Sequence, residues 1–278
     1  WYPAGWPGVT SRRVALGDGT SVRVVESGPA DGRPLVLLHG MLGSSRNWLT
    51  AGADLAARHH VLAPDLRNHG RSFHSEVMDY DELCGDVLRW LDAQGLGAVT
   101  LVGHSMGGFL AIRALIERPT EMARHLRGCV LMATFAGDVN RKNLQNRIQI
   151  PMIQSGLMSK LIRSDATAAF FAKSVIGDEK HPAMMDAFTA SFRKSNLKQL
   201  VPILTAFVKE DRYDQLGNVS MPCRIVVGEK DKTTPPFHTD WLHEGIKGST
   251  LKRIPKMGHM LNWESPEILV GEITALAR

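Results

Sequence analysis

Short apolar runs recur along the chain with the length and composition of β-strands. Residues 13–16 and 21–26 flank the turn sequence GDGT and therefore predict a hairpin. Other runs are almost entirely apolar, as expected for strands that a parallel sheet buries on both faces. They cover residues 34–38, 60–63, 99–103, 129–132, 223–227 and 251–254.

Stretches with helical periodicity separate these runs. Apolar residues recur at i, i+3 and i+4 within residues 45–58, 80–94, 106–117, 238–246 and 266–277. Strands that alternate with helices predict right-handed βαβ units and a doubly wound α/β sheet. The first ten residues are rich in Trp, Pro and Gly and predict an irregular arm.

The alternation stops between residues 135 and 222. This insert has no strand pattern and predicts four helical pieces, with Met152, Met158, Met184 and Met185 among them. Because the strand pattern resumes after it, we expect an excursion from one domain. Residues 1–134 and 223–278 would form the core domain, and residues 135–222 would form a helical cap.

One serine has the context of an activated nucleophile. The sequence GHSMGG at residues 103–108 follows an apolar run and begins a helical stretch. A tight strand-to-helix turn lifts such a serine, Ser105, clear of the sheet, where a base can remove its proton. Gly103 and Gly107 let the backbones cross, and the helix N-terminus favours a developing oxyanion. The alternative is an ordinary helix-capping serine.

His259 is the predicted base. It lies after the last predicted strand, at the same sheet edge as Ser105. Asp231 follows the preceding strand and is the predicted orienting carboxylate, which would fix the imidazole tautomer and stabilise the imidazolium. Glu229 and Asp138 are the alternatives to Asp231.

The loop after residues 34–38 predicts half of an oxyanion hole. Its backbone donor would be the N–H of Met41, or of Leu42 as second choice, and the other donor would be the N–H of Met106. We expect a substrate cleft lined by Leu42, His104, Trp48, Met152 and Met158, although Trp48 also fits a core position. The polar stretch at residues 65–72 predicts a turn held by side-chain hydrogen bonds rather than a catalytic element.

Composition and cysteine usage narrow the class of protein. With 44% apolar and 22% charged residues among 278, the chain is neither disordered nor a disulfide scaffold. Cys84, Cys129 and Cys223 are odd in number and lack metal-ligand spacing, so they predict buried thiols. We expect no metal and no cofactor. No apolar run is long enough to span a membrane.

The net charge of +5 is unevenly distributed. Residues 139–209 contain 11 Lys and Arg against 4 Asp and Glu. A solvated helical face accounts for this excess. The alternative is steering of anionic substrates, or association with anionic lipid surfaces, through Arg141, Lys142, Arg147, Lys160 and Arg163. A nucleic-acid partner is not expected, because no binding motif or interleaved aromatic residues accompany the charge.

Five motifs together resemble a known family. HGMLG, DLRNHGRS, GHSMGG, GEKDKTTP and GHMLNWESPE occur in this order, and they resemble the α/β-hydrolase-fold serine esterase and lipase superfamily. The segment RNHGRSFHSEVMDY is similar to acyl esterases of the α/β-hydrolase-domain-11 kind. The resemblance implies an α/β-hydrolase fold: an eight-stranded, mostly parallel sheet with helices on both faces and a helical cap inserted after strand six.

The expected function is that of a serine hydrolase. We expect cleavage of carboxylic esters with small to medium, mostly apolar acyl groups through an acyl-enzyme. A lactonase, thioesterase, carbon–carbon bond hydrolase or perhydrolase would use the same triad, and a receptor-like relative would only bind its ligand. A carboxylate nucleophile, which dehalogenases and epoxide hydrolases require, is absent from the GHSMGG turn. We expect a monomer or homodimer in the cytoplasm; because the chain opens at Trp1, secretion or membrane association stays open.

Overall fold

One sheet organises the molecule. The computed structural model describes residues 6, 8–76, 79–178, 185–186, 188–189, 193 and 197–277, and in this part eight strands have the order β1-β2-β4-β3-β5-β6-β7-β8. In this order, β4 and all the strands that follow it run parallel to one another. The pairs β1·β2 and β2·β4 are antiparallel. The strands are β1 (Thr10–Ala15), β2 (Ser21–Ser27), β3 (Arg33–Leu38), β4 (His59–Pro64), β5 (Val99–His104), β6 (Leu126–Met132), β7 (Cys223–Gly228) and β8 (Thr250–Ile254).

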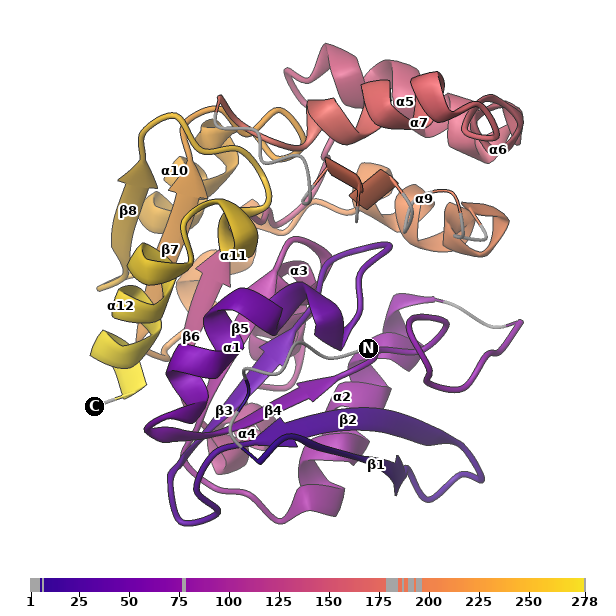
Figure 1. Cartoon of the computed structure of the whole chain (residues 1–278). Coiled ribbons are helices and arrows are strands. Elements are labelled where there is room, and N and C mark those ends of the chain that lie inside the picture. The colour runs from indigo at the N-terminus through magenta and orange to yellow at the C-terminus, as the bar shows by residue number, and fades with distance from the viewer. Residues whose placement is uncertain are drawn as a thin grey trace.

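Helices cover both faces of the sheet (Figure 1). The helices α1 (Leu49–Ala56) and α12 (Pro266–Ala277) pack on one face. The opposite face carries α2 (Tyr80–Gln94), α3 (Met106–Glu117) and α10 (Pro236–Gly245). Side chains of a strand alternate between the two faces. Leu37 of β3 therefore packs on the face that α1 and α12 cover, and Leu38 packs on the opposite face. This two-sided burial explains why the parallel strands are apolar at nearly every position.

The cap lies between β6 and β7. Its described part contains α5 (Leu144–Gln154), α6 (Leu157–Leu161), α7 (Asp165–Ser174) and α9 (Val201–Lys209), with a 3-10 turn at Leu197–Leu200. Figure 1 shows these helices gathered beyond one edge of the sheet. The two ends of the cap meet at Ala136, whose carbonyl accepts the N–H of Arg212 at 2.9 Å. Met184 lies outside the described residues, whereas Met185 is in a helical piece.

Short elements account for most differences from the predicted pattern. The helices α4 (Pro119–His125) and α11 (Leu261–Glu264) and the 3-10 turns Ser45–Trp48 and Tyr213–Asn218 are too short to show a periodicity. The first strand of the hairpin is longer than predicted, because β1 begins at Thr10 rather than at residue 13. Trp6 is buried, and its indole N–H donates to the Leu49 carbonyl at 2.9 Å. No helix among the described residues is both long enough and apolar enough to cross a bilayer.

Candidate active site

Ser105 occupies the sharp turn between β5 and α3. Its φ of 51° and ψ of −114° are a strained conformation for a residue with a side chain. Close packing requires glycine at the positions on either side of this turn. A Cβ on Gly103 would come within 2.6 Å of the Gly108 Cα, and a Cβ on Gly107 within 2.6 Å of the Leu38 carbonyl oxygen. The predicted strand-turn-helix context of Ser105 is therefore confirmed.

His259 and Asp231 are hydrogen-bonded partners. The Nδ1 of His259 lies 2.8 Å from Oδ2 of Asp231, and both residues are buried. Asp231 is fixed in turn, because its Oδ1 accepts the N–H groups of Thr233 and Thr234 at 2.8 and 2.9 Å. This arrangement holds His259 with Nδ1 protonated and leaves Nε2 as the available base.

The two alternative carboxylates lie elsewhere. Glu229 is exposed, and only its backbone N–H is engaged, with the Ile254 carbonyl. Asp138 forms an ion pair with Arg141 at 3.5 Å. Neither side chain is bonded to His259, so the structure pairs the imidazole with Asp231.

A cavity of about 710 Å³ contains both Ser105 and His259. Three of the five side chains predicted to line the cleft do so, namely Leu42, His104 and Met158, and Met41 of the predicted oxyanion loop lines it as well. The cap contributes apolar side chains that were not predicted: Ile150, Ile153, Phe171, Leu200, Leu204 and Phe207. Core and cap thus enclose one mostly apolar chamber around the serine.

Trp48 and Met152 are not among the lining residues, and Trp48 occupies the core position that its sequence context also allowed. Trp48 ends a 3-10 turn and is fully buried with Leu55 on the α1 face of the sheet. Met152 lies on α5 between Ile150 and Ile153. Those two residues are three apart and share the buried face, which leaves Met152 on the flank of the helix.

His104 supports the loop that carries His259. Its Nε2 lies 3.0 Å from the His259 carbonyl oxygen, and the two rings are 4.8 Å apart. Complete burial, reinforced by the neighbouring His259, holds the pKa of His104 well below its usual range. His104 is therefore neutral and donates to the backbone, although it also lines the cavity.

The loop after β3 is tied down by His39. Its Nδ1 lies 2.8 Å from the Gly40 carbonyl oxygen, and its Nε2 accepts the N–H of Leu66 at 3.0 Å. Burial lowers the pKa of His39, so the ring is neutral and can serve as both donor and acceptor. Within the described residues, no hydrogen bond uses the N–H of Met41 or of Met106. Both N–H groups are thus available to an oxyanion.

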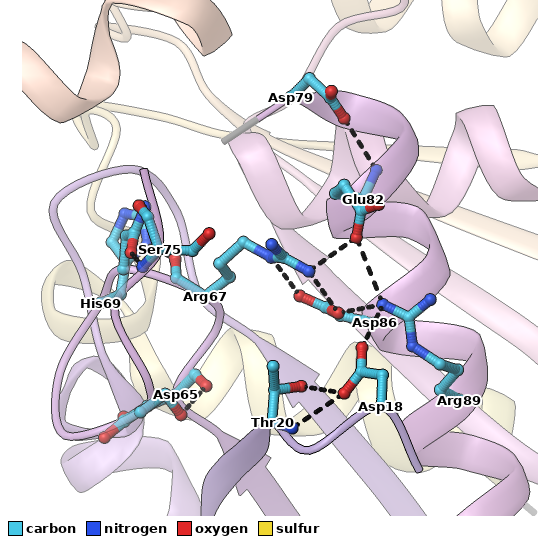
Figure 2. A network of polar contacts seen from close by, with 12 residues as sticks. Asp18, Thr20, Asp65, Arg67, His69, Ser75, Asp79, Glu82, Asp86 and Arg89 are labelled. Atoms are coloured by element: carbon cyan, nitrogen blue, oxygen red, sulfur yellow. Dashed lines mark hydrogen bonds and ion pairs between the residues drawn. The ribbon is translucent and has the colours of Figure 1, made fainter. Parts of the chain in front are cut away.

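Residues 65–72 form the predicted hydrogen-bonded turn. Asp65 accepts the N–H groups of Ser45 and Arg71 at 2.7 and 2.9 Å. Figure 2 shows Arg67 reaching Asp86 and Glu82 on α2, with Nε 2.6 Å from Oδ2 of Asp86. The hydrogen bonds that Arg67 donates to Asp86 raise the pKa of Arg67.

This turn also reaches the chamber. Asn68, His69 and Gly70 all line it. Arg89 adds ion pairs to Asp86 and to Asp18 of the N-terminal hairpin, which extends the network in Figure 2. The anchored turn thus gives one side of the cavity a fixed polar surface.

Glu264 is a positioning residue that the sequence analysis did not identify. Its Oε2 accepts the N–H groups of Gly177 and Gly258 at 2.7 and 2.8 Å, and its Oε1 accepts the N–H of Met260 at 2.9 Å. Gly258 and Met260 flank His259, whereas Gly177 belongs to the cap. Burial outweighs these hydrogen bonds and raises the pKa of Glu264.

A second contact ties the cap to the same loop. The N–H of His259 donates to the Val175 carbonyl at 2.9 Å, and the N–H of Asp178 donates to the Lys256 carbonyl at 2.8 Å. We call these bonds between the cap and the His259 loop the clamp. Its only signal in the sequence was a Glu in the motif GHMLNWESPE, five residues after His259. Its partner in the cap is 87 residues away, so spacing could not reveal it.

A sequence model described as the alpha/beta hydrolase family matches residues 35–272. The chain belongs to this family. Over 262 residues it is 27% identical to the dihydrolipoyllysine-residue acetyltransferase component of the acetoin cleaving system of Pseudomonas putida, covering 94% of this chain and 67% of that protein. Over 102 residues it is 39% identical to the sn-1-specific diacylglycerol lipase ABHD11 of Danio rerio, covering 36% of this chain and 32% of that protein.

The fold of this alpha/beta hydrolase is shared with solved structures. An esterase from Exiguobacterium antarcticum aligns with a TM-score of 0.83 at 20% identity, covering 96% of this chain and 99% of the esterase. At this level of identity the likeness establishes the fold. The predicted sheet with a cap inserted after the sixth strand is therefore confirmed, as is the family resemblance.

Proposed function

We propose that this alpha/beta hydrolase is a serine hydrolase that cleaves carboxylic esters through an acyl-enzyme. The observation that carries the proposal is the buried pair of His259 Nδ1 and Asp231 Oδ2, 2.8 Å apart, whose His259 lines the same cavity as Ser105 at its strained turn. The names of two relatives, the diacylglycerol lipase of Danio rerio and the esterase YbfF of Escherichia coli, support the ester class.

The proposed mechanism assigns one role to each group. The Ser105 hydroxyl attacks the ester carbonyl while Nε2 of His259 takes its proton. Asp231 stabilises the imidazolium that forms, and the N–H groups of Met41 and Met106 stabilise the oxyanion. The imidazolium then protonates the leaving alcohol, which leaves the acyl group on Ser105. Water, deprotonated by His259, releases the acid and regenerates the hydroxyl.

The chamber supports a mostly apolar acyl group of small to medium length. Its volume of about 710 Å³ is within the range of sites for small organic ligands. Ile153, Leu204 and Phe207 of the cap supply its apolar wall. Asn47 and Asn68 lie on the core side of the chamber and suit the more polar alcohol part of the ester.

A chain-length series tests the proposal. Wild type and Ser105→Ala would be compared on p-nitrophenyl esters from acetate to laurate, with fluorophosphonate labelling of both proteins. We expect wild type to hydrolyse the short and medium esters and to be labelled, and Ser105→Ala to do neither. Absence of hydrolysis at every chain length, or labelling that persists in Ser105→Ala, would contradict the proposal.

A further inference from the structure

Large apolar side chains are exposed on the outside of the cap. Among the described residues with high exposure, Leu144 is 72% exposed, Phe170 68%, Ile148 54% and Leu157 46%. All four belong to α5, α6 or α7. We call these four side chains the cap patch. Large exposed apolar patches mark sites of interaction with another surface.

The cap helices are apolar on two sides. On α5, Leu144 and Ile148 are one turn apart and point outward, whereas Ile150 and Ile153 face the chamber. On α7, Phe170 is exposed while its neighbour Phe171 lines the chamber. A surface helix normally needs one apolar face to pack on its core, so the outer apolar face serves something else.

The start of α5 lies beside the end of α7. Gln145 and Ser174 are joined by a hydrogen bond of 3.5 Å, which places the start of α5 beside the end of α7. Ile148 lies about one turn after Gln145, and Phe170 lies about one turn before Ser174. The two exposed side chains therefore each lie within about one helical turn of this contact. In Figure 1, α5, α6 and α7 form the outermost layer of the cap.

Exposed basic side chains lie on the same part of the cap as the cap patch. Arg147, Lys160, Arg163 and Lys173 are exposed on the same helices or the turns that follow them. Asp165, the acid at the start of α7, is already paired with Arg193. The charged surroundings of the exposed apolar side chains are therefore cationic.

Two of the five basic residues singled out from the sequence do not belong to this surface. Arg141 is paired with Asp211 and Asp138, and its guanidinium lies over the Trp241 ring. Lys142 lies near the same ring, with Nζ 5.5 Å from its centroid. Among the described cap residues, Arg147, Lys160, Arg163 and Lys173 by contrast take part in no ion pair, and Arg147 donates to the Asn140 carbonyl at 3.0 Å.

We propose that the cap patch docks on an anionic lipid surface. Leu144, Ile148 and Phe170 would enter the boundary between headgroups and acyl chains, while Arg147 and Lys173 contact the anionic headgroups. This inference extends the proposed function, since the cap would then bring the chamber to a surface that holds apolar esters. Both components are required: apolar side chains for insertion, and basic ones for the preference for anionic lipid.

Vesicle co-sedimentation tests the docking separately from hydrolysis. The protein would carry Ser105→Ala, so that binding does not depend on turnover. The vesicles would be phosphatidylcholine alone or phosphatidylcholine mixed with phosphatidylglycerol. The double substitution Ile148→Ser with Phe170→Ser removes apolar contacts, and Arg147→Gln with Lys173→Gln removes charge. Ile268→Ser, at an exposed position on α12, is the matched control.

We expect binding to the mixed vesicles that the apolar double substitution weakens by at least about tenfold. The charge double substitution should abolish the preference for phosphatidylglycerol, and Ile268→Ser should change nothing. Failure of the parent protein to bind either vesicle would overturn the inference. So would a dimer, detected by ultracentrifugation, that Ile148→Ser with Phe170→Ser dissociates. With Ser105 restored, fluorophosphonate labelling reports separately on the proposed function.

Discussion

Replacing Glu264 by glutamine would disturb the clamp between the cap and the His259 loop while keeping the shape of the side chain. The carboxylate accepts three backbone N–H groups, two at Oε2 and one at Oε1. Glutamine has a single acceptor oxygen, and its NH₂ group must occupy the other position. If the NH₂ group faces Met260, one N–H loses its acceptor; if it faces Gly177 and Gly258, two do.

The expected loss of unfolding free energy follows from the amide orientation that leaves only the Met260 N–H without an acceptor. One hydrogen bond to a charged acceptor is worth about 1.5–3 kcal/mol, so the free energy of unfolding should fall by about that amount. The actual loss will be near the lower end, because burial of the negative charge already disfavours the carboxylate and raises its pKa. The lost N–H bond belongs to Met260, which follows His259 directly. A base displaced by a fraction of an ångström should reduce kcat by about 10- to 100-fold.

The assay would measure kcat and KM on a soluble p-nitrophenyl ester, together with urea unfolding. Glu267→Gln is the matched control, because Glu267 is exposed in the first turn of α12, three residues away. We expect Glu267→Gln to match wild type and Glu264→Gln to lose kcat at a temperature where it is fully folded. A variant that is less stable but has unchanged kcat would refute the positioning role and leave Glu264 with a structural one.

Four further predictions concern single residues. Asp231→Asn should lower kcat by about 10³–10⁴-fold with an unchanged far-UV CD spectrum, because the imidazole loses its orienting carboxylate; a loss below tenfold would contradict its assignment. Leu204→Trp should shorten the longest ester that is hydrolysed while acetate esters remain substrates, and an unchanged series would place the acyl group elsewhere. Burial lowers the pKa of His238 to about 4, so between about pH 6.5 and pH 4 the unfolded chain binds more protons than the folded protein. The free energy of unfolding should therefore fall by about 3 kcal/mol as the pH drops through this range. Urea unfolding should show a smaller fall for His238→Gln. Burial also raises the pKa values of Cys84 and Cys223 to about 12, so iodoacetamide at pH 8 should label both only after unfolding.

The sequence was most informative where local pattern and burial coincide. Strands that are buried on both faces must be apolar at nearly every position, and this made β3, β5 and β7 easy to locate. The turn at Ser105 was predictable for a different reason. The backbone there leaves no room for side chains at Gly103 and Gly107, so the packing dictates the residue type.

Side-chain direction in short or irregular elements was not predictable. Trp48 lies at the end of a 3-10 turn, and α1 begins at the next residue. The geometry of this junction determines which face of the sheet the Trp48 side chain packs on. Met152 has the residue type of a pocket lining, yet the register of α5 gives that position to Ile150 and Ile153. Neither outcome follows from composition, because a change of one residue in register turns a helical side chain through about 100°.

Contacts between distant segments escaped prediction for a more general reason. His39 and Glu264 bind backbone groups, and a backbone N–H carries no residue identity that a sequence pattern could show. The charge count of the insert had the same kind of limit. It could not distinguish Arg141, which is paired, from Arg147, whose outward neighbours Leu144 and Ile148 are apolar.

The Val175–Gly177 end of the cap and the cap patch are two separate places with different expected roles. Its Val175–Gly177 end is bonded to the His259 loop through the Val175 carbonyl and through Glu264. The cap patch, by contrast, lies on exposed positions of α5, α6 and α7, and none of its residues lines the chamber or belongs to that loop. Because no residue is shared, substitutions at the two places should act independently. Ile148→Ser with Phe170→Ser should weaken binding to anionic vesicles with kcat on a soluble ester unchanged, whereas Glu264→Gln should lower kcat with vesicle binding unchanged.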